Sequence, residues 1–312
     1  MKKISIVTGC YNEEDNVKLL YEKISAQMSQ YKNKYEWELI YIDNCSTDNT
    51  VNILKDIASA DKKVKIIVNS RNFGHIRSPH YAILNAYGDA VIFMVSDLQD
   101  PPELLPELIK KWEDGYKIVL AQKNVSEESK FMFTIRRIFY GLLKNIVDDN
   151  TEQIKQFTGF GLYDKQVVDV FRTIDDPYPY FRGLISEVGF EKAIVKFTQP
   201  TRKRGRTKNN FYTLYDMAML GIVKHSKVPL RAATITGFIL SVISVMIAFF
   251  YLVYKLIFWS SFEVGIAPLI IGLFTFASFQ LFVLGLVGEY VGAIYTRVDK
   301  KPLVIEKERI NF

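Results

Sequence analysis

The sequence predicts an α/β domain with a mostly parallel sheet and flanking helices, followed by two transmembrane helices. Two observations support this. Short apolar runs alternate with helical spacings over the first 121 residues, and two long uncharged stretches follow residue 228. Near-continuous apolar strands separated by helices are typical of parallel sheets that are covered on both faces. The chain has 312 residues, of which 49% are hydrophobic, and this composition excludes a disordered chain.

The strands and helices of the first part can be assigned in order along the chain. Runs rich in β-branched and aromatic residues predict five strands, at residues 3–8, 37–42, 64–68, 90–95 and 118–121. Apolar spacing and start signals predict four helices, over residues 14–31, from Ser46 or Thr47, over residues 79–87 and from Pro101. In such a sheet, ligands bind beyond the carboxyl ends of the strands.

Polar residues follow the first, second and fourth strands where each strand ends. They are Tyr11, Asn12, Glu13, Asp43, Asn44, Ser46, Asp97, Gln99 and Asp100. Because these strand ends meet at one edge of a parallel sheet, we expect the three clusters to form one pocket. No Gly-x-Gly-x-x-Gly follows a strand, and no phosphate-loop motif is present. A dinucleotide-binding fold and a phosphate-loop ATPase are therefore not expected.

Two of these clusters have structural as well as functional interpretations. Asp43 is placed either to cap the following helix or to accept hydrogen bonds from a base or ribose. The stretch SDLQDPPE is either an acidic helix entry or a set of oxygen ligands. Oxygen ligands suit Mg²⁺ or Mn²⁺ shared with substrate phosphates. The residues alone leave both pairs of interpretations open.

The two uncharged stretches, residues 232–254 and 264–288, are long enough to cross a membrane. At ~1.5 Å per residue each reaches about 35 Å, against a hydrocarbon core of ~30 Å. Lys and Arg flank the outer ends of both stretches, and the N-terminus has no apolar run of signal-peptide length. We therefore expect a two-pass protein of the plasma (inner) membrane, with both termini and the active site in the cytoplasm.

The net charge of +6 is unevenly distributed along the chain. Residues 192–227, directly before the first uncharged stretch, hold nine Lys or Arg and one Asp. Such a segment suits anionic lipid head groups and a phosphorylated ligand equally, and the two interpretations are compatible. Its most basic stretch, TRKRGRTK, lacks an interleaved aromatic platform, so no nucleic-acid partner is expected. Residues 131–147 are amphipathic and basic, which suits either the membrane interface or a surface helix.

Four motifs occur in order at the strand ends: YNEE, IDNCSTDNT, SRNFGH and SDLQDPPE. Together they resemble the family 2 glycosyltransferases of the GT-A (Rossmann-like) fold. Within that family the chain is similar to the membrane-anchored polyprenyl-phosphate glycosyltransferases, which include dolichol-phosphate mannose synthases and bacterial undecaprenyl-phosphate enzymes. The stretch TRKRGRTKNNF is similar to the family's Arg-x-x-Gly-x-Ser/Thr-Lys element. The resemblance covers nearly the whole chain.

The resemblance implies transfer of a sugar from a nucleotide-sugar to polyprenyl (undecaprenyl) phosphate, with inversion, for cell-envelope glycan or glycolipid modification. A UDP-hexose or UDP-N-acetylhexosamine is expected from the frequency of such donors in the family. The acceptor phosphate is largely dianionic at pH 7, because its second pKa is ~6, and needs no strong general base. The harder task is to stabilise charge on the leaving diphosphate, for which a divalent cation is suited.

The resemblance also assigns roles to residues of this chain. The catalytic residues are Asp97, Gln99 and Asp100, of which Asp97 and Gln99 would hold Mg²⁺ or Mn²⁺. The nucleotide-binding residues are Thr8, Tyr11, Glu13, Asp43 and Arg71. The residues for the acceptor phosphate are Arg202, Lys208, Lys123, Arg136 and Arg137.

Two positions depart from the family pattern. Val95 stands where relatives usually have an Asp two residues before Asp97, and Phe160 follows Thr158-Gly159 where many have an Asp. The metal site is then completed by the donor diphosphate, or it is weak or absent. The departures leave open a degenerate transferase that serves as a membrane scaffold. A processive polysaccharide synthase is a second rival, although no Trp follows an Arg as in the Gln-x-x-Arg-Trp element of those enzymes.

The expected domain organisation has three parts. Residues 1–228 form the cytoplasmic catalytic domain, of which residues 192–228 are the basic membrane-proximal segment. Residues 229–296 form the two transmembrane helices, and residues 297–312 form a cytoplasmic tail. Small residues in the second uncharged stretch and just after it would allow close helix packing in a homo-oligomer. They are Gly272, Gly285, Gly288 and Gly292.

Overall fold

The computed structural model describes residues 1–123, 157–179, 181–200, 228–258, 266–298 and 301–312. The chain forms two compact units. The first comprises residues 1–135, 150–213 and 299–312, and the second comprises residues 136–149 and 214–298. Residues after the second long helix therefore belong to the same unit as the N-terminal sheet.

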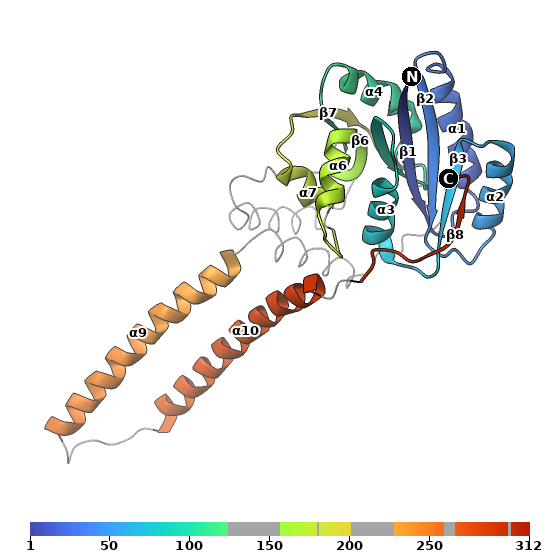
Figure 1. Ribbon diagram of the computed structural model, residues 1–312. Helices are drawn as coiled ribbons and strands as arrows, with labels where there is room; N and C mark the ends of the chain where they lie inside the picture. Colours follow the sequence, from blue (N-terminus) through green and yellow to red (C-terminus); the bar gives the residue numbers. More distant parts are fainter. Residues whose placement is uncertain (124–156, 180, 201–227, 259–265, 299–300) are drawn as a thin grey trace. The chain divides into compact units, whose positions relative to one another are not determined.

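An eight-stranded mixed sheet forms the centre of the first unit, in the order β7-β5-β6-β4-β1-β2-β3-β8 (Figure 1). The strands are β1 (Lys2–Cys10), β2 (Tyr35–Asp43), β3 (Val64–Asn69), β4 (Ala90–Val95), β5 (Ile118–Lys123), β6 (Phe157–Asp164), β7 (Lys192–Phe197) and β8 (Glu306–Ile310). Strands β6 and β8 run antiparallel to their neighbours, and the other pairings are parallel. The carboxyl ends of β1 to β4 therefore lie on one edge, as expected.

Helices cover both faces of this sheet. They are α1 (Val17–Ser29), α2 (Thr50–Ala60), α3 (Gly74–Leu84), the 3₁₀ helix η1 (Pro102–Leu104), α4 (Leu105–Glu113), α6 (Lys165–Thr173) and α7 (Phe181–Glu187). One apolar core packs under α1, α2 and α4, and a second packs under α3, α6 and α7. In β2, Leu39 and Tyr41 enter the first core while Ile40 and Ile42 enter the second, because successive side chains of a strand alternate.

The five predicted strands are confirmed, but the helix starts differ from the prediction, since α1 begins at Val17 rather than at residue 14 and η1 begins at Pro102 rather than at Pro101. Helix α2 begins at Thr50 rather than at Ser46 or Thr47, because those two residues form hydrogen bonds with the loop after β1. Helix α3 begins at Gly74 and contains Pro79 in its interior. An interior proline removes one backbone donor and its ring crowds the carbonyl oxygen four residues earlier, yet α3 continues through it to Leu84.

The C-terminal residues add an edge strand that the sequence pattern does not predict. Strand β8 pairs antiparallel with β3, so five residues of the expected tail form part of the sheet. The side chain of Asn311 donates to the carbonyl oxygens of Ala58 and Val64, each at 2.8 Å. Lys55 on α2 forms an ion pair with Glu308 at 2.6 Å. These contacts fix the end of the chain to α2 and β3.

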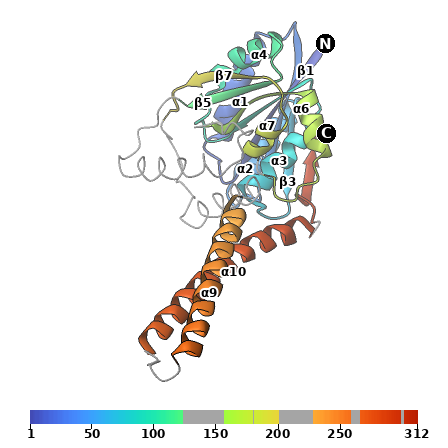
Figure 2. The same ribbon diagram turned by 90° about the vertical axis from the view of Figure 1, so that its left-hand side faces the viewer.

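The second unit contains two long helices, α9 (Val228–Ile257) and α10 (Ile266–Val298) (Figure 2). Within α10, the 24 residues Thr275–Val298 are long and apolar enough to cross a membrane, and none of that stretch is buried. This is the one candidate span among the residues that the structure describes. The two uncharged stretches that the sequence predicts as membrane spans thus lie largely in α9 and α10. That α9 crosses a membrane is a proposal.

Candidate functional site

Three loops at the carboxyl edge of the sheet share an unusual backbone conformation. Asn12 after β1, Cys45 after β2 and Leu98 after β4 have φ angles of 55°, 66° and 61°. Non-glycine residues in this left-handed region are uncommon, and Asn tolerates it best. Each costs of order 1–3 kcal/mol and persists only where the surroundings hold it, typically near functional sites. All three occur in the predicted clusters.

The loops after β1 and β2 are joined by hydrogen bonds into one structure. The backbone N–H of Asn12 donates to the Ser46 hydroxyl at 2.9 Å, and the N–H of Thr47 donates to the Asn12 side-chain oxygen at 2.8 Å. The N–H of Glu13 donates to the Thr50 hydroxyl at 2.9 Å. Predicted residues Tyr11 and Glu13 therefore lie beside the loop that follows Asp43.

Asp43 lies inside this joined loop structure. Its carboxylate accepts the Ser46 N–H at 2.9 Å and the Ser46 hydroxyl, and the residue is fully buried. Burial raises the pKa of Asp43, and the bonds from Ser46 oppose that rise. Because α2 starts only at Thr50, Asp43 does not cap that helix. Thr8, another predicted residue, is also fully buried, and its hydroxyl has no hydrogen-bond partner in the described structure.

Asn44 connects the end of β2 to the loop between β3 and α3. Its side-chain oxygen accepts the N–H of Phe73 at 2.8 Å and the side-chain amide of Asn69 at 3.0 Å. Its side-chain amide donates to the Asn72 side chain at 2.9 Å and to the Gly74 carbonyl at 3.2 Å. Sequence reasoning placed Asn44 in a polar cluster but gave it no role.

The loop held by Asn44 carries predicted residue Arg71. Its guanidinium lies 4.1 Å from the ring centroid of Phe73, and the guanidinium of Arg77 lies 5.4 Å from the same ring. Neither arginine has an ion-pair partner among the residues that the structure describes. Burial and the charge of Arg71 lower the pKa of Arg77. The edge beyond β3 is therefore cationic.

The turn after β4 carries the predicted acidic residues. Asp97 accepts the Gln99 N–H at 3.1 Å, and Asp100 accepts the Val95 N–H at 3.0 Å. Asp100 is 1% exposed, and its second carboxylate oxygen has no hydrogen-bond partner in the described structure. Burial, with a smaller contribution from the charge of Asp97, raises the pKa of Asp100 to about 7. Asp100 closes the turn that presents Asp97 and Gln99.

These residues fit a divalent cation only as part of a shared site. The turn supplies hard oxygen donors from Asp97 and Gln99, which suit Mg²⁺ or Mn²⁺. No group of three His, Cys, Asp or Glu residues able to hold a metal occurs in the described part of the chain. Mg²⁺ commonly binds one or two carboxylates and takes its other ligands from water and substrate phosphates. The remaining ligands would then come from the donor diphosphate.

The basic residues predicted for the acceptor are only partly described. Lys123 ends β5 and donates to the side chain of Gln199, beyond β7, at 2.6 Å. The other four predicted residues lie outside the described ranges: Arg136, Arg137, Arg202 and Lys208. Phe160, at the family's acidic position, is fully buried and packs edge-to-face on Phe197 with ring centroids 5.8 Å apart. This position therefore contributes to the core.

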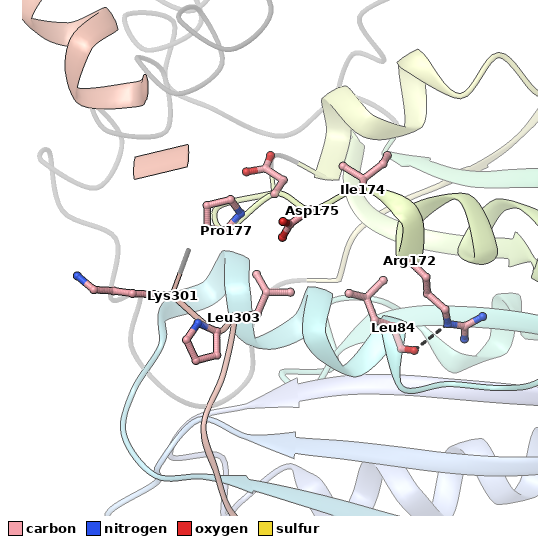
Figure 3. Close-up of a pocket in the computed structure, with 9 residues that line it drawn as sticks. Leu84, Arg172, Ile174, Asp175, Pro177, Lys301 and Leu303 are labelled. Carbon is pink, nitrogen blue, oxygen red and sulfur yellow. Dashed lines mark hydrogen bonds between the residues drawn. The ribbon is translucent and has the colours of Figure 1, made fainter. Parts of the chain in front are cut away.

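A groove of about 390 Å³ lies between α3, the segment after α6 and the residues that precede β8 (Figure 3). It is lined by Leu84, Arg172, Ile174, Asp175, Asp176, Pro177, Lys301, Pro302 and Leu303. Arg172 donates from Nε to the carbonyl oxygen of Leu84 at 3.0 Å. None of the predicted site residues lines this groove.

The buried carboxyl of Asp100 predicts a pH-dependent stability. Its pKa is raised from 3.8 to about 7 in the folded protein, so folding favours the protonated form. The destabilisation is present above pH 7 and disappears as the pH falls toward 4. Asp100→Asn keeps an acceptor for the Val95 N–H and removes the charge, with a gain of up to roughly 4 kcal/mol at pH 8. Melting temperatures of the full chain should differ most between the two proteins at pH 8 and least at pH 5, whereas parallel profiles would contradict the prediction.

Comparisons with known proteins agree with this geometry. The family model described as glycosyl transferase family 2 matches residues 5–171. An uncharacterised glycosyltransferase of Bacillus subtilis (strain 168), YkcC, is 35% identical over 303 residues, which cover 96% of this chain and 92% of that protein. An SfII prophage-derived bactoprenol glucosyl transferase of Shigella flexneri is 31% identical over 308 residues, which cover 98% of both chains.

A solved structure shows the same fold at low sequence identity. The glucosyl-3-phosphoglycerate synthase of Mycobacterium tuberculosis, crystallised with Mg²⁺ and uridine diphosphate, matches with a TM-score of 0.50 and 17% identity. The match covers 71% of this chain and 77% of that one. The expected GT-A-like sheet with flanking helices is therefore confirmed.

Proposed function

The chain belongs to glycosyltransferase family 2, and from this we propose that it transfers a sugar from a nucleotide-sugar to polyprenyl phosphate at the membrane surface. One observation carries the proposal. The similarity to the bactoprenol glucosyl transferase of Shigella flexneri extends over 98% of this chain, so it includes the basic segment and both long helices as well as the catalytic domain. A soluble acceptor would not require those parts.

We propose that the nucleotide binds across the loops after β1, β2 and β3. Tyr11 and Glu13 lie in the first loop, and Asp43 lies behind Ser46 in the second. In the described conformation the Ser46 hydroxyl donates a hydrogen bond to the Asp43 carboxylate. An N–H or O–H of the bound nucleotide would replace this hydroxyl as the donor. Arg71 would complete the site from the third loop. A uridine nucleotide is the proposed donor.

The leaving diphosphate would lie at the turn after β4. Asp97 and Gln99 would hold Mg²⁺ or Mn²⁺ there, and the cation would neutralise charge that develops on the diphosphate. Asp100 keeps the turn closed through its bond from the Val95 N–H. The acceptor phosphate attacks as an anion, so this chain needs no strong base, and the sugar is transferred with inversion.

Two anions must approach each other in this reaction, so the acceptor phosphate needs cationic partners. Residues 192–227 hold nine Lys or Arg and one Asp directly before α9. We assign Arg202 and Lys208 in this segment to the acceptor phosphate, with Lys123, Arg136 and Arg137 as further candidates. Both α9 and α10 would cross the membrane, with the catalytic domain and both termini in the cytoplasm.

Loss of the acceptor-binding charges should weaken acceptor binding. A hydrogen bond to a charged group contributes about 1.5–3 kcal/mol, so Arg202→Gln or Lys208→Gln should raise the KM for undecaprenyl phosphate roughly 10-fold or more. The KM for the donor should stay unchanged. Lys110→Gln, on the exposed surface of α4, is the matched control for the loss of one positive charge. If Arg202→Gln, Lys208→Gln and Lys110→Gln changed the KM for undecaprenyl phosphate equally, the assignment would be contradicted.

The proposed function is tested by offering the protein a panel of nucleotide-sugar donors. The purified full chain is given undecaprenyl phosphate, Mg²⁺ or Mn²⁺, and one labelled nucleotide-sugar at a time, including UDP-glucose, UDP-N-acetylglucosamine and GDP-mannose. Label should enter the lipid phase with at least one donor, and only when the acceptor is present. The absence of lipid-linked label with every donor would refute the proposal and favour the scaffold alternative.

A further inference from the structure

The chain that follows α10 contacts the proposed nucleotide site. Residues 301–305, which we call the C-terminal strap, lead into β8 at the outer edge of β3. The strap begins three residues after Val298, the last residue of α10. It belongs to the same compact unit as the sheet. A segment at the far end of the sequence therefore flanks a strand end that carries predicted site residues.

Two polar contacts attach the strap to this edge, one to the loop between β3 and α3 and one to α3 itself. The backbone N–H of Ser70 donates to the carbonyl oxygen of Ile305 at 2.9 Å. The guanidinium of Arg77 donates to the carbonyl oxygen of Pro302 at 2.5 Å. Ser70 directly precedes Arg71, and Arg77 shares the ring of Phe73 with Arg71. The strap thus contacts the chain on both sides of the arginine assigned to the nucleotide.

The same loop is held on its other side by Asn44. That side chain accepts the N–H of Phe73 and donates to the carbonyl oxygen of Gly74. Asn44 and the strap are more than 250 residues apart in sequence, yet both bond to a loop of only a few residues. The conformation of the Arg71 loop therefore depends on β2 from one side and on the strap from the other.

Burial contributes little to the attachment of the strap. Val304 is 5% exposed, but Ile305 is 55% exposed, and Lys301 and Pro302 are also exposed. Figure 3 shows Leu303 beside the groove described above, with Leu84 of α3 also lining it. Because most residues of the strap are exposed, its polar contacts contribute strongly to its position. A single substitution at such a contact should therefore have a measurable effect.

We propose that the C-terminal strap is a structural part of the donor site, and that Arg77 is the positioning residue that links the strap to the Arg71 loop. The proposal rests on the assignment of Arg71 to the nucleotide in the proposed function. A loop fixed before the nucleotide arrives loses less conformational entropy on binding. The strap therefore raises the affinity for the donor and leaves the chemical step unchanged.

Arg77→Gln in the full chain tests this role. We expect the Kd for UDP with Mg²⁺, measured by calorimetry, and the KM for the donor to rise about 10-fold, with kcat unchanged, because one charged hydrogen bond and one stacking contact are lost. The matched control is Asn311→Ala, which breaks two hydrogen bonds of 2.8 Å at the opposite end of the same strand. The control should lower the melting temperature and leave the Kd for UDP unchanged.

Hydrogen exchange of residues 69–74 distinguishes the proposed role of the strap from the proposed function. Arg77→Gln should increase exchange in this loop even without nucleotide, and Asn311→Ala should not. If the wild type binds none of the nucleoside diphosphates offered, the proposed function fails while the exchange result still tests the strap. An unchanged Kd for UDP in Arg77→Gln would overturn the inference, as would equal weakening in both variants.

Discussion

Asp97→Asn should reduce kcat roughly a thousandfold or more while the melting temperature stays unchanged. Asp97 supplies the carboxylate of the turn after β4, which Asp100 closes through the Val95 N–H at 3.0 Å. The substitution keeps the size of the side chain and an acceptor for the Gln99 N–H. It removes the negative charge that would hold the cation at the leaving diphosphate. Initial rates at saturating donor, acceptor and Mg²⁺ measure the effect.

The matched control for Asp97→Asn is Asp114→Asn. Asp114 is an exposed carboxylate at the end of α4 and makes no part of the proposed site. The control should retain wild-type kcat. Turnover by Asp97→Asn at the rate of the control would remove the metal role from this residue. A second readout is the dependence of rate on Mn²⁺, which should shift to higher concentrations in Asp97→Asn only.

Asp43→Asn should raise the KM for the donor roughly 10- to 100-fold, since a charged hydrogen bond contributes about 1.5–3 kcal/mol. The variant still accepts the Ser46 N–H, so the loop should keep its conformation. The Kd for UDP should rise in proportion to KM, and kcat at saturating donor should change little. The effect thus differs in kind from that of Asp97→Asn, because Asp43 is assigned to the nucleoside rather than to the leaving group.

Two further variants test this assignment of Asp43. Ser46→Ala removes the hydroxyl that donates to the Asp43 carboxylate, and with it the acceptor of the Asn12 N–H. If the melting temperature is unchanged, the Kd for UDP should stay the same or fall. Asp56→Asn, on the exposed surface of α2, controls for the loss of one negative charge. If Asp43→Asn binds UDP as tightly as Asp56→Asn does, the nucleotide role of Asp43 is wrong.

The parallel part of the fold could be predicted from the sequence because its signals are local. The strand at residues 90–95 is observed with those bounds, and the others differ by one or two residues at their ends. The apolar and β-branched side chains of these strands fill the two cores. Strand β8 could not be predicted, because an edge strand buries little and EKERI carries mostly charged residues. Its stability comes from pairing with β3 and from contacts to α2 and α3.

The strand ends that form the candidate site could be predicted from the sequence, but the contacts between the side chains there could not. The motifs placed Glu13, Asp43 and Asp97 at or just after strand ends on the same edge, and the structure confirms this common edge. The role of Asn44 was missed because its partners lie 25–30 residues away, beyond the range of helix or strand spacing. The burial of Asp100 was missed for a similar reason, since burial depends on packing by distant elements.

The product formed from undecaprenyl phosphate tests the central claim most directly. The full chain, the acceptor and the donor selected by the panel are incubated, and the lipid phase is analysed by phosphorus NMR and mass spectrometry. Transfer of the sugar alone predicts one lipid phosphodiester and one released nucleoside diphosphate per turnover. A lipid diphosphate with release of a nucleoside monophosphate, or no lipid-linked sugar at all, would contradict the account.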